Sequence, residues 1–201
     1  MRFIQLRHGE TLWNVEQRLQ GHENSELSER GREQARRFAK YAAALRPRHV
    51  VSSDLGRTRE TARLLGYGDV PCDERFRELH MGEWTGRTKP DLLANQADDY
   101  HAWRAGQFIP ENGESWNGFR ARVAEAIRHW LAQAEGDVLA VVHSGVIRAA
   151  CSEFLGIPPS KIIPTTPGAS TILNFDGPDR AEARLEGYNI GALVPDDFAA
   201  D

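Results

Sequence analysis

The chain has 201 residues, of which 40% are hydrophobic and 27% charged, the balance of an ordinary globular protein. Its formal net charge of −4 argues against a general nucleic-acid binder, whose domain should be basic. No apolar stretch is long enough to span a bilayer, the N-terminus lacks the hydrophobic region of a signal peptide, and two cysteines are too few for a disulfide framework. We therefore expect a cytoplasmic protein with a single domain over residues 1–201 and with no membrane or nucleic-acid partner.

Strand patterns alternate with helical patterns along most of the chain. Short apolar runs predict strands at 2–6, 49–53 and 137–142, and apolar residues at helical spacing predict helices at 29–45, 57–65 and 144–155. A further helix should carry an apolar face from Phe119 to Ala134, and two antiparallel strands are expected at 171–175 and 183–188. This alternation predicts an α/β fold, a three-layer sandwich with a mainly parallel central sheet and helices on both faces.

Residues 88–106 read as one or two short helices outside this alternation. We interpret residues 87–110 as a lid or insertion over the sheet rather than as a second domain. Several large side chains could line the mouth of a pocket beside this lid, although such residues more often belong to a core. They are Trp13, Met81, Trp84, Trp103 and Trp116.

Basic side chains follow the predicted parallel strands at the point where each strand ends. Arg7 and His8 follow the first strand, Arg57 lies just past the second, and His143 follows the third. Right-handed crossovers place these exits at one edge of the sheet, so the four side chains should converge. Such a cluster suits a phosphate, because several donors can engage its oxygens at once. The alternative is an ordinary set of strand-to-helix turns with solvated arginines.

The motifs around these residues fall into four blocks. They read LRHGETLWN at 6–14, followed by Gln20-Gly21 and LSERG at 27–31; SSDLGRTRETA at 52–62; ELHMGEWTG at 78–86; and VVHSGVIR at 141–148. In this order, from residue 1 to about residue 150, the blocks resemble the histidine phosphatase superfamily, in its phosphoglycerate mutase-like branch.

The resemblance implies a role for each residue of the site. It implies His8 as the phosphorylated nucleophile, Glu78 as the proton donor, and a phosphate pocket of Arg7, Arg57 and His143. It further implies secondary substrate contacts from Asn14, Gln20 and Gly21. We add Ser144 to these substrate contacts. Relatives more often have a glycine at this position, and we expect the serine to alter only a backbone contact. No cofactor or metal is expected, because the two arginines supply the positive charge that a metal would bring.

Elementary chemistry agrees with these roles. His8 must be unprotonated to attack, and the neighbouring arginines should lower its pKa. Arg7, Arg57 and a protonated His143 would stabilise the negative charge of the transferring group. A carboxylic acid at Glu78, with its pKa raised, would protonate the leaving alkoxide and then act as the base that activates water.

The sequence therefore predicts a metal-independent phosphatase that hydrolyses a small phosphorylated metabolite through a phosphohistidine. One alternative is phosphoglycerate mutase-type phosphoryl transfer, which the shortness of the chain and the segment from Glu78 to residue 110 disfavour. The other is a non-catalytic phospho-ligand sensor, which needs neither a nucleophile at His8 nor an acid at Glu78. Candidate substrates are sugar phosphates, phosphoglycerate derivatives and the nucleotide-loop phosphates of cobamide synthesis. The sequence does not rank them, and it does not reveal the oligomeric state.

Overall fold

A computed structural model of the protein describes residues 1–176 and 182–191. Five strands form one sheet in the order β2-β3-β1-β4-β5. Their bounds are Arg2–Arg7 (β1), His49–Ser52 (β2), Val138–Val142 (β3), Ser170–Phe175 (β4) and Ala183–Ile190 (β5). Strands β2, β3 and β1 run parallel, whereas β4 is antiparallel to β1 and β5 is antiparallel to β4. The predicted parallel centre and the predicted antiparallel end strands are both confirmed.

Seven α-helices and three short 3₁₀ helices connect the strands within the described residues. The α-helices are Leu12–Val15 (α1), Glu29–Leu45 (α2), Gly56–Leu64 (α3), Lys89–Asn95 (α4), Ala97–Arg104 (α5), Trp116–Gln133 (α6) and Ser144–Leu155 (α7). The 3₁₀ helices are Glu74–Phe76 (η1), Gly82–Trp84 (η2) and Pro159–Lys161 (η3). Helices α2 and α6 begin where serine side chains cap them, Ser28 on the N–H of Gly31 and Ser115 on the N–H of Gly118.

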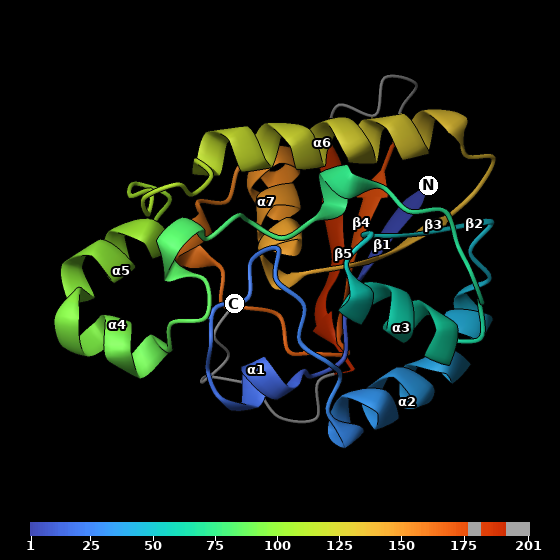
Figure 1. Ribbon diagram of the computed structural model, residues 1–201. Coiled ribbons are helices and arrows are strands. Elements are labelled where there is room, and N and C mark those ends of the chain that lie inside the picture. Colours follow the sequence, from blue (N-terminus) through green and yellow to red (C-terminus); the bar gives the residue numbers. More distant parts are fainter. Residues whose placement is uncertain (177–181, 192–201) are drawn as a thin grey trace.

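Helices cover both faces of the sheet (Figure 1). On one face, Ile4 and Leu6 of β1 pack with Phe38 of α2 and with α3. On the other face, Phe3 of β1 packs with Val123 of α6 and with α7. Neighbouring residues of β1 face opposite sides because side chains alternate along a strand, and the central strand β3 is buried on both faces. The predicted three-layer sandwich is therefore confirmed.

Helices α4 and α5 lie apart from the sheet, at the left of Figure 1. Their apolar side chains close a small aromatic cluster in which the Trp84 ring lies 5.8 Å from the ring of Trp103 and 6.5 Å from that of Tyr100. Met81, Trp84 and Trp103 are buried, which supports the core interpretation for these three. Trp13 and Trp116 are half-buried. Within the part of the chain that the structure describes, no helix has the length and apolar character needed to cross a membrane.

Candidate active site

The ends of the three parallel strands bring the two predicted histidines together. Arg7 at the end of β1 pairs with Val142 of β3, so His8 and His143 leave the sheet side by side. Their ring centroids are 5.3 Å apart and their planes meet at 62°. Both histidines are buried, as are Arg7 and Arg57. The structure thus gathers all four strand-exit residues at one edge of the sheet.

A close approach of two backbones shapes the exit of β1. A side chain on Gly9 would place its Cβ 2.3 Å from the carbonyl oxygen of Gly31. Only glycine therefore lets the residue after His8 lie against the first turn of α2. This contact holds the chain after β1 against α2, directly beyond His8.

The hydrogen bond of the His8 ring determines which nitrogen can attack. Nδ1 lies 2.8 Å from the carbonyl oxygen of Gly9, and a carbonyl can only accept, so Nδ1 carries the proton and Nε2 keeps its lone pair. Burial holds the pKa of His8 well below its usual value, and the charges of Arg57 and Arg7 lower it further. The expected effect of the arginines is present, but burial is the larger cause. His8 is therefore neutral and can act as a nucleophile at neutral pH.

The His143 ring differs from the sequence-based expectation. Burial, followed by the charge of Arg57, holds the pKa of His143 well below its usual value, so the ring is neutral rather than protonated when no anion is bound. Its Nε2 lies 3.0 Å from Oγ of Ser53, and its buried Nδ1 has no hydrogen-bond partner among the residues that the structure describes. If the Ser53 hydroxyl donates to Nε2, Nδ1 carries a proton and still offers an anion a donor.

Backbone carbonyls orient the two arginines of the site. Arg57 donates from Nη1 to the carbonyl of Glu23 at 2.7 Å and from Nη2 to that of Gly21 at 2.8 Å. Its buried Nε has no hydrogen-bond partner within residues 1–176 and 182–191. Burial lowers the pKa of Arg57 to about 10, which leaves the side chain charged at neutral pH. Arg7 donates from Nη1 to the carbonyl of Thr165. A bound anion would meet the unused Nε–H of Arg57 and offset the cost of burying its charge.

The secondary residues of the site take different parts. Asn14 accepts two bonds on Oδ1, from the N–H and the hydroxyl of Thr11, each 3.0 Å long. In the described part of the chain, neither the buried Nδ2 of Asn14 nor the buried Oε1 of Gln20 has a hydrogen-bond partner. Gly21 contributes the carbonyl that orients Arg57. Asn14 and Gln20 thus keep polar atoms for a ligand, whereas Gly21 acts through the arginine.

Ser144, which the sequence analysis placed among the substrate contacts, bonds to a backbone group in the structure. Its Oγ accepts from the N–H of Thr165 at 3.2 Å, and the carbonyl of Thr165 in turn accepts from Arg7. Ser144 therefore helps to hold the loop that orients Arg7.

Glu78 reaches the same spot from the loop between η1 and η2. Its Oε1 accepts a hydrogen bond from the N–H of the next residue, Leu79, at 2.8 Å, and its Oε2 accepts one from the N–H of Gly145 at 3.0 Å. Gly145 is the second residue of α7, so the carboxyl lies at the positive end of that helix, next to His143. A Cβ on Gly145 would lie only 2.1 Å from Oε1 of Glu78, which explains the need for glycine there.

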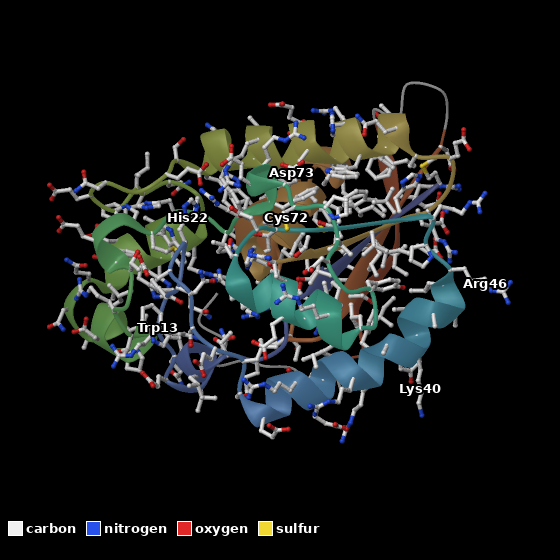
Figure 2. All side chains as sticks on the ribbon, turned by 45° about the vertical axis from the view of Figure 1, so that its right-hand side comes forward. Trp13, His22, Lys40, Arg46, Cys72 and Asp73 are labelled. Carbon is white, nitrogen blue, oxygen red and sulfur yellow. The ribbon has the colours of Figure 1, made fainter. Side chains whose placement is uncertain are left out.

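Several residues of the site region had no role in the sequence analysis. Ser53 bonds to His143, the carbonyl of Thr165 binds Arg7, and Nε2 of His22 donates to the carbonyl of Glu78 at 2.9 Å. Figure 2 shows His22 and Trp13 on the side of the molecule that carries α4 and α5. Ser53 stands at the end of a predicted strand and could have been found from that position. The other two lie in irregular loops, where no periodic pattern signals a contact.

The chain matches the family model of the histidine phosphatase superfamily (branch 1) over residues 3–189. It is 38% identical over 170 residues to the glucosyl-3-phosphoglycerate phosphatase of Mycobacterium tuberculosis (strain ATCC 25618 / H37Rv), which covers 78% of this chain and 76% of the relative. It is 37% identical over 164 residues to a probable phosphoglycerate mutase of Enterobacter sp. (strain 638), which covers 76% of this chain and 74% of that relative.

Solved structures agree with these relatives. A mycobacterial glucosyl-3-phosphoglycerate phosphatase in complex with VO3 has a TM-score of 0.87 and 32% identity, covering 94% of this chain and 98% of the other. The alpha-ribazole phosphatase of Shigella flexneri has a TM-score of 0.80 and 29% identity, covering 98% and 100%. The motifs, the fold and these matches together establish that the chain belongs to the histidine phosphatase superfamily, branch 1.

Proposed function

We propose that this protein is a phosphomonoesterase that transfers the phosphoryl group of its substrate first to Nε2 of His8 and then to water. The observation that carries the proposal is the His8 ring itself. Its Nδ1 is bonded to the carbonyl of Gly9, so the lone pair of Nε2 is available on a buried ring that feels the charges of two arginines. The phosphatase class agrees with the names of several relatives and of the solved structures.

In the first step, the lone pair of His8 Nε2 attacks phosphorus and the bond between phosphorus and the ester oxygen breaks. The Glu78 carboxylate takes up a proton when the anionic phosphate binds beside it, and it gives this proton to the leaving alkoxide. Arg7, Arg57 and Nδ1–H of His143 stabilise the charge on the transferring oxygens. The imidazole becomes a phosphorylated imidazolium whose Nδ1–H still donates to the Gly9 carbonyl.

In the second step, water attacks the phosphorus of the phosphohistidine. The Glu78 carboxylate takes a proton from this water, the bond between phosphorus and Nε2 breaks, and its electron pair returns to His8. Inorganic phosphate then leaves, and both residues are back in their starting forms.

His8→Ala tests this mechanism directly. We expect hydrolysis of 4-nitrophenyl phosphate to fall by at least about 10³-fold, because the nucleophile is lost. The matched control is His129→Ala, which removes an exposed imidazole on α6 and should leave the rate unchanged. Acid-labile, base-stable labelling of the wild-type protein by a ³²P-labelled substrate should also disappear in His8→Ala. Undiminished turnover in that variant would exclude the mechanism.

The substrate class that we propose is a phosphate ester of a small sugar or sugar-acid derivative. Relatives named for glucosyl-3-phosphoglycerate and alpha-ribazole phosphatase activity support it. Phosphate release from glucosyl-3-phosphoglycerate, α-ribazole 5′-phosphate and 3-phosphoglycerate, compared at equal concentrations, tests it. Because another relative is named a probable phosphoglycerate mutase, the products from 3-phosphoglycerate also matter. Inorganic phosphate supports the phosphatase, whereas 2-phosphoglycerate supports the mutase.

We also propose that residues 87–110 form a lid that selects the substrate. The start of this segment is hydrogen-bonded to the loop before Gln20, from Leu19 N–H to the Arg87 carbonyl at 3.0 Å and from Lys89 N–H to the Gln17 carbonyl at 2.8 Å. At the end of α5, the backbone carbonyl of Arg104 accepts a hydrogen bond from Nη2 of Arg148, on α7. The segment is thus anchored at both ends beside the site, where its side chains can contact the part of the substrate that varies.

We expect the protein to act in the cytoplasm, since Cys72 and Cys151 are both free thiols.

A further inference from the structure

Glu78 lies in an irregular loop, and its backbone is held by side chains from elsewhere in the chain. The loop runs between η1, which ends at Phe76, and η2, which begins at Gly82. The carbonyl of Glu78 accepts from Nε2 of His22 at 2.9 Å and from Nη2 of Arg122 at 3.0 Å. Glu78 belongs to no strand or helix, so these bonds hold its backbone, while its carboxylate oxygens accept from the N–H groups of Leu79 and Gly145.

Arg122 contributes more to this loop than the bond to Glu78. Its Nη1 donates to the carbonyls of Arg75 at 2.7 Å and Arg77 at 2.8 Å. Its Nε and Nη2 donate to the two carboxylate oxygens of Glu114, each at 2.7 Å. With the bond to Glu78, all five N–H groups of the guanidinium have acceptors, so Arg122 uses every hydrogen-bond donor of its side chain.

The other end of the loop is bound by the same ion pair. The N–H of Glu114 donates to the carbonyl of His80 at 2.9 Å, and the N–H of His80 lies 3.3 Å from Oε2 of Glu114. Arg122 and Glu114 therefore hold the chain on both sides of Glu78, from residue 75 to residue 80.

The arginine itself has a rigid base. It lies on α6, where its guanidinium carbon is 4.7 Å from the centre of the ring of Phe119, a buried residue one turn earlier. The stacked, forked guanidinium has one geometry, which a lysine at the same position cannot reproduce. Because the pair bonds the backbone of the Glu78 loop, a shift of the pair would move Glu78 relative to His8.

We propose that Arg122, oriented by Glu114, is the positioning residue of the proton donor: it sets the place of the Glu78 carboxyl opposite the leaving oxygen. This inference rests on the proposed role of Glu78 as the acid. A purely structural role for the pair predicts a loss of activity that is the same for every substrate. A positioning role predicts a loss that grows as the leaving group needs its proton more.

Arg122→Lys separates the two roles. We measure kcat/KM for 4-nitrophenyl phosphate, whose leaving group needs little protonation, and for phenyl phosphate and an alkyl phosphate, whose leaving groups need progressively more. We expect a loss of about 30-fold for the alkyl phosphate and less than about threefold for 4-nitrophenyl phosphate. An equal loss for all three substrates, or no loss, would overturn the inference.

Arg128→Lys is the matched control. Arg128 lies on the same helix, bonds to Glu153 at 2.8 Å and lies 5.1 Å from the ring centre of Phe154, but contacts the carboxylate of a different helix rather than the Glu78 loop. It should leave all three values unchanged. Thermal unfolding checks that Arg122→Lys folds, and Glu114→Gln is a second variant in case it does not. Glu114→Gln should also lose more kcat/KM for the substrates with poorer leaving groups, but by less, about fivefold for the alkyl phosphate. An equal loss for all three substrates would count against the proposal.

Glu78→Gln distinguishes failure of this inference from failure of the proposed function. A loss that depends on the leaving group in Glu78→Gln, but not in Arg122→Lys, leaves the acid role intact and rejects the positioning role. A uniform result in Glu78→Gln rejects the acid role and, with it, the inference. In a Glu78→Gln background, Arg122→Lys should change the alkyl phosphate rate by less than about twofold, because the group that it positions is gone. If Arg122→Lys still lowered the alkyl phosphate rate by about 30-fold in the Glu78→Gln background, Arg122 would act on a group other than Glu78.

Discussion

His8 and His143 have similar burial but different hydrogen bonds, and these bonds separate their functions. The carbonyl beside His8 can only accept, which leaves its Nε2 as a nucleophile. The hydroxyl of Ser53 beside His143 can donate, which leaves Nδ1–H of that ring for the substrate. Under the proposed mechanism, two histidines thus take different roles, one as the nucleophile and one as a donor to the phosphate, because their hydrogen-bond partners differ.

The depressed pKa values of the two histidines predict how stability depends on pH. In the folded protein both rings stay neutral below the ordinary value of 6.5, whereas in the unfolded chain they take up protons there. The unfolded state therefore binds more protons as the pH falls below 6.5, and the folded state loses stability, by about 1 kcal/mol per pH unit for each ring. Thermal unfolding of wild type and His143→Gln between pH 7.5 and pH 5 measures this.

His143→Gln should show the shallower pH dependence, because it cannot be protonated. An equally steep fall in the variant would mean that His143 does not contribute. His129→Ala, which removes an exposed imidazole, is the control and should follow the wild type.

At the scale of elements, α7 determines where the acid and the phosphate site meet. It begins directly after His143 at the end of β3, and its second residue binds the Glu78 carboxyl. The N-cap residue His143 makes no capping bond with its own side chain. The N–H of Gly145 instead donates to the Glu78 carboxylate, at the end of the helix that favours negative charge.

Gly145→Ala should separate activity from folding. The new methyl group would lie 2.1 Å from Oε1 of Glu78, so the carboxyl must move and its bond to the helix N–H is lost. We expect kcat to fall by about 10²-fold, because moving a catalytic group by about 1 Å can lower the rate by that factor. The unfolding temperature should change little, because alanine favours a helix over glycine.

The control for this substitution is Gly118→Ala, in the first turn of α6, where the nearest atom to the new Cβ is Oγ of Ser115 at 3.2 Å. Hydrolysis of 4-nitrophenyl phosphate should remain at the wild-type rate in that variant. Equal rates for Gly145→Ala and Gly118→Ala would contradict the placement of Glu78.

At the scale of the whole molecule, we propose that the sheet and the lid have separate tasks. In this proposal the parallel strands and α7 carry the phosphate chemistry, whereas α4 and α5 lie to one side (Figure 1), and α5 shares an aromatic cluster with Trp84. Hydrogen bonds join the lid to the loop before Gln20 and to Arg148. This division lets the lid vary without disturbing the phosphate pocket.

Exchange of residues 87–110 for the equivalent segment of a relative tests this division. We expect the preferred substrate to change by about tenfold or more in kcat/KM, because contacts to the variable part of the substrate differ. Hydrolysis of 4-nitrophenyl phosphate, which offers the lid little to contact, should change by less than about threefold. An unchanged substrate profile would reject the lid as the source of selectivity.

The family, the α/β sandwich and the phosphatase class were predictable from the sequence, and the matches and the structure confirm them. They depend on local properties: the hydrophobic period identifies strands and helices, and the order of strand exits brings His8, Arg57 and His143 to one edge. The separation of the sheet faces followed in the same way from the alternation of Phe3 and Ile4 along β1.

Only the tertiary structure decided the protonation of the histidines and the support of Glu78. We expected a protonated His143, but burial together with Arg57 keeps it neutral, and burial is a property of the assembled fold. The contacts of Arg122 with the Glu78 loop span 44 to 47 residues of chain and end on backbone carbonyls, which every residue type possesses. A sequence pattern reports side-chain identity, so it cannot specify a contact whose acceptor is the backbone itself.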